Sequence, residues 1–387
     1  MRRLIATLGV WAALTTTVAA DDHRVEAKGA DEIRDVLAND LDALFLLQDA
    51  TARGRNDAAA LQKQLLVSIG GRFTKIGRAD PNMLAPLAAG YVLSGGNPDA
   101  VAELTKSAAL TPSHRHLLEG VSLFMRGERD EAAKLLRDMD TAGLPARIAG
   151  RVALAQSLLE QEFGARQERL STAIAAMPGT LVEESALRRS ALAFAEAGDE
   201  NRFWRRLKRY QRRFPDSLYA KTFWQDVMFN LVKWSTTGKP PDAARLDLIL
   251  QDMALSRRRE IYLHLARQAA KLNEQKLVGF ASRRVHRLAV PGSQEDQTAR
   301  FYMSLYDVVS EKADSARAEL EKIDRNMLLP HEQALLEAAL WIAQEVNRPA
   351  AAGSSGIPSG SVERSPLQER AESLLSAADK VLSEIQS

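Results

Sequence analysis

The sequence predicts an all-α protein, an α-solenoid built from helical hairpins. Apolar residues recur at helical spacing along most of the chain, as at Leu117, Leu118, Val121 and Phe124. Aromatic residues make up only 6% of the chain and alanine is abundant, which favours packed helices over sheets. Prolines recur at nearly regular intervals, each in a short break between helical segments, where a helix can begin but not continue.

The prolines set the period of the predicted repeat. They lie 31, 33, 33 and 37 residues apart, at Pro81, Pro112, Pro145, Pro178 and Pro215. Two helices between successive breaks resemble tetratricopeptide repeats. Small, turn and packing residues match that family in the unit ending at Pro145: Gly120, Gly127, Ala132 and Leu136. Gly90 is out of phase and the leading tryptophan is missing. We therefore expect a right-handed α-solenoid of degenerate tetratricopeptide-like helical hairpins over residues 21–347.

The expected helices follow from the same periodicity. Three hairpins stand in the first half, at 87–93 with 99–110, 113–125 with 131–140, and 181–197 with 201–214. Further helices are expected at 218–235, 242–255, 257–272, 274–289, 294–310, 313–324 and 331–347. In the turn "LSGGNPDAVAEL" (93–104), we expect Gly95 or Gly96 to end one helix, Asn97 to cap the next and Pro98 to open it. No lysine follows to hold a phosphate, so this stretch is interpreted as a turn.

Both ends of the chain differ from the helical body. Residues 1–20 carry two arginines, a short apolar run and small residues before Ala20, which predicts a secretory signal cut after Ala20. The alternative is a buried N-terminal helix. Residues 348–365 are rich in Ala, Gly, Ser and Pro, which predicts a flexible linker. Residues 366–387 predict a charged C-terminal helix that folds back as a cap or stays detached.

Composition removes several kinds of chemistry. Cysteine is absent, so there is no thiol nucleophile and no thiolate ligand. Beyond residue 20 the chain carries 50 basic and 50 acidic residues, which gives no global attraction to nucleic acid. The helix that starts "HEQAL" at 331 has leucine at 335, where a zinc-protease helix has its second histidine. No P-loop is present. We expect no catalytic, cofactor-binding or metal residues, no cofactor and no membrane span after the signal.

One helix is a candidate binding element, "NRFWRRLKRYQRRF" at 201–214. Phe203, Leu207, Tyr210 and Phe214 step by four, three and four, so they predict one buried stripe. Six of the seven cations then lie on the outward arc, with Arg206 nearer its edge. One interpretation is a solvated helix face. The other is a docking surface for an acidic partner, anionic lipid or cell-wall polymer, and its candidate residues are Arg202, Arg205, Arg209, Arg212 and Arg213.

Two stretches carry a family resemblance, "LLVSIGGRF" (65–73) and "DPNMLAPLAAGYVLSGGNPDAVAEL" (80–104). With the signal and the helical body, they make the chain resemble the MotC family of periplasmic motility proteins of rhizobia and related alphaproteobacteria. The resemblance implies a periplasmic protein required for flagellar rotation. It also implies binding to the periplasmic part of the stator protein MotB, which forms a proton channel with MotA, and a dedicated chaperone, MotE. No binding residues come with the resemblance.

Three functional hypotheses remain open from the sequence. The first is a non-catalytic periplasmic interaction protein of the flagellar motor. The second is a general periplasmic repeat scaffold that binds cell-wall polymer or another envelope complex through the arginines. The third is an enzyme whose site is assembled from scattered residues, which requires a deep, dry pocket lined by perturbed carboxylates.

Overall fold

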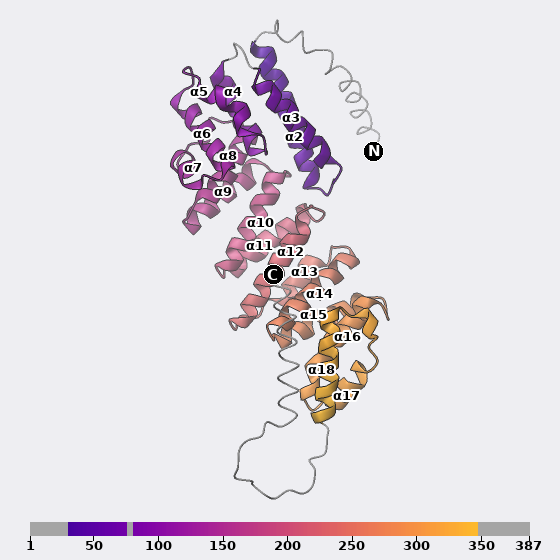
Figure 1. Ribbon diagram of the computed structural model, residues 1–387. Helices are drawn as coiled ribbons and strands as arrows, with labels where there is room; N and C mark the ends of the chain where they lie inside the picture. Colours follow the sequence, from indigo (N-terminus) through magenta and orange to yellow (C-terminus); the bar gives the residue numbers. More distant parts are fainter. Residues whose placement is uncertain (1–29, 76–79, 347–387) are drawn as a thin grey trace, which may run out of the picture. The chain divides into compact units, whose positions relative to one another are not determined.

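The computed structural model describes residues 30–75 and 80–346. All regular structure in these two ranges is helical, which confirms the all-α prediction (Figure 1). No helix within them has the length and apolar character that a membrane crossing demands. The expected signal peptide (1–20), linker (348–365) and C-terminal helix (366–387) lie outside the described residues.

The helices follow one another along the chain with short connections. In the first half they are α2 (Ala30–Thr51), α3 (Ala58–Phe73), α4 (Pro81–Leu93), η2 (Pro98–Val101), α5 (Ala102–Lys106), α6 (Pro112–Arg126), α7 (Arg129–Leu136), α8 (Ala146–Leu159) and α9 (Phe163–Ala176). Then come α10 (Leu181–Glu196), α11 (Glu200–Arg213), α12 (Ala220–Thr236), α13 (Ala243–Leu250), α14 (Leu255–Lys271), α15 (Gln275–Leu288), α16 (Gln294–Leu305), η3 (Asp307–Val309), α17 (Ala313–Leu320), η4 (Arg325–Met327) and α18 (Pro330–Val346).

The prolines stand where hairpins begin, as predicted. Pro81 and Pro112 are the first residues of α4 and α6, and Pro145 is the N-cap of α8. Pro178 and Pro215 lie in the turns before α10 and α12. Proline fits the first helical position of Pro81 and Pro112 because its φ is already helical and its missing N–H has no partner in a first turn.

The described chain divides into two compact units. The residues up to Ala193, with Asn201–Ala220, form the first unit, and Phe194–Glu200 with the residues from Lys221 form the second. Helical pairs pack together within each unit, such as α6 with α7 and α8 with α9 in the first, and α14 with α15 in the second. The bounds, handedness and tetratricopeptide-like character of a solenoid over 21–347 stay predictions.

A buried arginine ties α2, α4 and α8 together inside the first unit. Arg151 is 5% exposed, and its guanidinium carbon lies 3.5 Å from the centroid of the Phe45 ring. It donates to Gln48 Oε1 at 3.2 Å and to Ser94 Oγ at 3.2 Å, while Gln48 Nε2 donates to the Ser94 carbonyl. Burial lowers the pKa of Arg151 to about 10, so it remains charged near neutral pH.

The turn at 93–104 has the predicted geometry. Gly95 adopts a left-handed φ of 94°, Asn97 Oδ1 accepts from the Asp99 N–H at 3.0 Å, and Pro98 opens η2. The Asn97 N–H donates to Tyr91 Oη at 3.1 Å, so the turn lies against that buried ring. A Cβ at Gly96 would lie 2.5 Å from Tyr91 ring atoms, which explains the second glycine.

Four predicted helices are clearly shorter than expected, and two of them, over 242–255 and 313–324, end at Leu250 and Leu320. The helix over 99–110 is instead η2, the five-residue α5 and a turn. Arg115 of α6 donates to the carbonyls of Thr105 at 3.1 Å and Ser107 at 2.8 Å. These two hydrogen bonds satisfy carbonyls at the end of α5 that would otherwise accept from backbone N–H groups of a longer helix. The helix over 294–310 ends at Leu305 and is followed by η3.

In the second unit, two helices begin at buried carboxylates. Asp296 of α16 is 4% exposed; it accepts from the Gly292 N–H at 2.9 Å and lies 2.7 Å from His286 Nδ1 of α15. Glu332 of α18 is fully buried and accepts from the Leu329 N–H at 2.9 Å and from Arg267 Nε of α14 at 2.9 Å. Both acids therefore cap their own helix and join it to another.

We predict that Gly96→Ala destabilises the protein, because the new methyl group must displace the Tyr91 ring. The expected loss is about 1–3 kcal/mol of unfolding free energy, the usual range for overpacking. Gly143→Ala is the matched control, since a Cβ there meets no atom within 4 Å, and it should change stability by less than about 0.5 kcal/mol. Urea unfolding followed by circular dichroism measures both, and equal stability of the two variants would contradict the steric explanation.

Candidate interaction surface

Helix α11 is divided into a buried face and a cationic face. Phe203, Leu207 and Tyr210 are fully buried, and Phe214 just beyond the helix is 1% exposed, so the predicted stripe is confirmed. Six of the seven cations between 202 and 213 are exposed. Arg206 is half-buried and donates to the hydroxyls of Ser190 and Ser171, and burial is the main cause of its lowered pKa.

The five candidate arginines have different surroundings. Arg209 and Arg213 both bind the buried carboxylate of Glu183, through Nε at 3.0 Å and 2.8 Å respectively. Arg205 and Arg212 are exposed and have no ion pair with any described residue. Arg202 is exposed near the first turn of the helix. The structure thus places all five on the outward side and uses two of them to hold the helix.

Lys208 is not among the five candidate residues, but it belongs to a line of exposed cations on α11. It is exposed and, like its neighbours in the line, has no ion pair within the described part of the chain. Arg205, Lys208 and Arg212 are spaced by three and four residues, so they share one side of α11 over roughly 10 Å. We call these three residues the cationic stripe.

Glu183 sets the position of the stripe. Its side chain is fully buried, whereas those of Arg209 and Arg213 are 42% and 40% exposed. The Glu183 carboxylate also accepts from the Gly179 N–H at 2.6 Å, just before α10. One side chain of α10 thereby holds two successive turns of α11, which fixes how α11 is rotated about its axis.

Glu184, the next residue, binds the inner face of α11. Its Oε1 accepts from the Tyr210 hydroxyl at 2.9 Å and from Ser217 Oγ at 3.1 Å, and Arg188 lies beside it at 3.3 Å. Burial and the nearby carboxylate raise the pKa of Tyr210, which keeps its hydroxyl protonated as a donor. The start of α10 is fixed in turn by Asp49 of α2, which accepts from the Leu181 N–H at 2.8 Å.

These carboxylates were not singled out from the sequence. The available signal was the pair Thr180 and Glu183, which has the spacing of a capping box, and Thr180 Oγ1 does lie 3.4 Å from the Glu183 nitrogen. Their pairing with α11 joins residues 26 and 30 positions apart, and that separation has no periodic signature.

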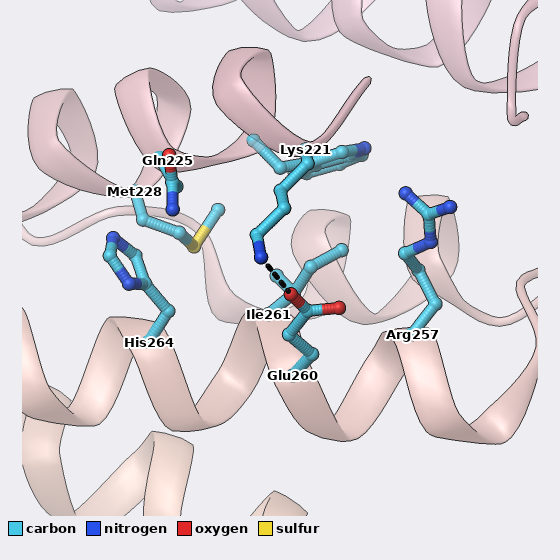
Figure 2. A pocket seen from close by; sticks show the side chains of 8 residues that line it. Lys221, Gln225, Met228, Arg257, Glu260, Ile261 and His264 are labelled. Carbon is cyan, nitrogen blue, oxygen red and sulfur yellow. Dashed lines mark ion pairs between the residues drawn. The ribbon is translucent and has the colours of Figure 1, made fainter. Parts of the chain in front are cut away.

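A second feature is a hollow between α12 and α14 in the second unit. Lys221, Trp224, Gln225 and Met228 line it from α12, and Arg257, Glu260, Ile261 and His264 line it from α14. Figure 2 shows Lys221 reaching across to Glu260, an ion pair of 3.7 Å, and Met228 lying beside His264. The Glu260 side chain is 56% exposed. This is not the deep, dry, carboxylate-lined pocket that the enzyme hypothesis requires.

We predict that Glu183→Gln destabilises the first unit by about 1–3 kcal/mol, because it weakens four hydrogen bonds to a charged acceptor, from Gly179, Arg209 and Arg213. The cost stays below that of a fully buried broken pair, since both arginines reach solvent. Glu131→Gln is the matched control, an exposed partner of Lys134 whose loss should cost less than about 1 kcal/mol. Thermal unfolding by circular dichroism compares them, and a Glu183 variant as stable as the control would refute the anchoring role.

Comparison with known proteins gives the family. A family model described as chemotaxis protein MotC matches residues 2–387. The chemotaxis protein MotC of Rhizobium meliloti (strain 1021) is 32% identical over 344 residues, which is 85% of this chain and 76% of that protein. No solved structure matches. These matches confirm the family resemblance, and the chain therefore belongs to the MotC family of chemotaxis and motility proteins.

Proposed function

We propose that the protein is a non-catalytic periplasmic component of the flagellar motor that binds the periplasmic part of the stator protein MotB. The observation that carries the proposal is the family match over residues 2–387. The predicted signal at 1–20, cut after Ala20, delivers the chain to the periplasm. The family resemblance adds MotE as a dedicated chaperone on the way to the motor.

The helical hairpins form, in this proposal, a degenerate tetratricopeptide-like solenoid over residues 21–347. Support comes from the prolines at successive hairpin starts and from the packing of consecutive helices within each unit. Repeat folds of this kind offer an extended surface to a partner rather than a closed site. That suits a protein whose task is to hold another protein in one conformation.

The cationic stripe is the docking element of the proposal. Arg205, Lys208 and Arg212 have no ion pair among the described residues, so their charges are available to a partner. Two carboxylates about 10 Å apart, for example at positions i and i+7 of a helix, would meet the two ends of the stripe. Arg209 and Arg213 are held in ion pairs with Glu183, but they still contribute positive potential to this face of α11.

Binding changes the motor through differential affinity. If the protein binds one conformation of the MotB periplasmic part more tightly than another, it shifts the stator toward that conformation and so changes the state of the MotA–MotB proton channel. No chemical step is required.

Deletion of the gene should leave flagella assembled and cells unable to swim. The wild-type chain supplied from a plasmid should restore swimming, and osmotic-shock fluid should contain it with Asp21 as its first residue. Electron microscopy, motility agar and N-terminal mass analysis are the measurements. Normal swimming of the deletion strain, with flagella present, would end the proposal.

Charge reversal of the stripe should abolish partner binding without unfolding the protein. Arg205→Glu with Arg212→Glu leaves the Glu183 pairs intact, and affinity for the purified periplasmic part of MotB should fall at least tenfold. Lys63→Glu with Lys276→Glu is the control, because it gives the same change of net charge at exposed positions of α3 and α15.

Biolayer interferometry at two salt concentrations gives the affinities, with a steeper salt dependence for wild type than for the stripe variant. Equal affinities of the stripe variant and the control would remove the stripe from the interface. Pelleting of the wild type with peptidoglycan, lost in the stripe variant while MotB binding persists, would assign the stripe to cell-wall polymer instead.

A further inference from the structure

The hollow between α12 and α14 combines an apolar floor with a polar rim. Trp224, Met228 and Ile261 form the floor, and each is less than 5% exposed. Lys221, Arg257 and His264 stand on the rim, with Glu260 and Gln225 (Figure 2). Small ligand sites commonly combine apolar side chains with a few polar groups that fix the orientation of the ligand.

The rim is electropositive. Arg257 has no ion pair with any described residue, and Lys221 has only the 3.7 Å pair with Glu260, in which both side chains are more than half exposed. The pKa of His264 is lowered, first by burial and then by Arg267 and Lys271, with Lys221 adding to them and Glu260 opposing. His264 is therefore uncharged at neutral pH. The other charged groups of the rim are two cations, Lys221 and Arg257, and one acid, Glu260.

The floor also contains an unused donor. Trp224 is 3% exposed, and its Nε1–H is buried without a hydrogen-bond partner in the described structure. A buried indole N–H normally has an acceptor, so an unpaired one beside a hollow favours a ligand that brings an acceptor to this wall. The same kind of ligand is favoured by the unpaired N–H, by the cationic rim and by the apolar floor. It has an anionic hydrogen-bond acceptor next to an apolar group.

We propose that this hollow binds a short segment of a partner protein in which an apolar side chain lies next to a carboxylate. The apolar side chain rests on Trp224, Met228 and Ile261, and the carboxylate lies between Lys221 and Arg257. A phosphate polymer would satisfy the cations but bring no apolar group to the hollow, so a peptide is the better occupant. The site belongs to the second unit and the cationic stripe to the first, and the site does not depend on the partner being MotB.

Lys221 is free to exchange partners on binding. Exposed ion pairs contribute little to stability, and the 3.7 Å separation to Glu260 is longer than that of a charge-assisted hydrogen bond. An incoming carboxylate can therefore take Lys221 from Glu260 at small cost. Arg257, which has no partner to give up, can bind the same carboxylate through two N–H groups.

The test is a titration followed through the indole N–H signal of Trp224. The probe is the peptide acetyl-Glu-Leu-Glu-amide, with acetyl-Gln-Leu-Gln-amide as its uncharged counterpart, added to the ¹⁵N-labelled chain without residues 1–20. Four of the five tryptophans remain in this shortened chain, because Trp11 lies within residues 1–20, and Trp224→Phe assigns the signal. The acidic peptide should shift the Trp224 signal in a saturable way, with a Kd at least tenfold lower than that of the uncharged peptide.

Variants separate this site from general charge effects. Lys221→Gln with Arg257→Gln should weaken binding of the acidic peptide at least tenfold. Lys233→Gln, an exposed cation on the same helix outside the hollow, should leave the affinity unchanged. No shift of the Trp224 signal at millimolar peptide, equal binding of the two peptides, or equal effects of the two sets of variants would overturn the proposal. None of these outcomes bears on MotB binding by the stripe.

Discussion

The packing of this protein depends on carboxylates buried at the third position of a helix. Glu183, Asp296 and Glu332 each accept a backbone N–H from the residues just before their own helix, and each binds a basic side chain from another helix. The helix N-terminus favours the negative charge, and at Glu183 and Glu332 arginines from another helix compensate for its burial. A single side chain thus fixes where a helix starts and which helix it packs against.

This arrangement separates structural cations from available ones on α11. Arg209 and Arg213 lie on the same exposed face as the cationic stripe but are held by Glu183. Arg206, turned toward the core, is held by two serine hydroxyls. The three residues of the cationic stripe have no ion pair among the described residues, so the position of α11 does not depend on them. A basic helix can therefore be read as structural or functional only after its acidic partners are known.

Most of the fold could be predicted from the sequence because its signals are local. Helical periodicity, proline at hairpin starts and the Gly95-Gly96-Asn97-Pro98 turn all act within a few residues, and all are confirmed. The short α5 was missed because Arg115, from the next helix, ends it. The Glu183 anchor and the hollow of α12 and α14 were missed for the same reason: both arise from side chains that tertiary packing brings together.

The anchoring of α11 by Glu183 also has a kinetic consequence. Since the helix is already rotated into place, a partner orders only flexible side chains, at a cost of about 0.5–1.5 kcal/mol each. Exposed charges of this kind raise the association rate of a complex more than they lower its dissociation rate. A complex held at the stripe alone would form quickly and dissociate quickly. Long residence would require apolar contacts elsewhere on the surface.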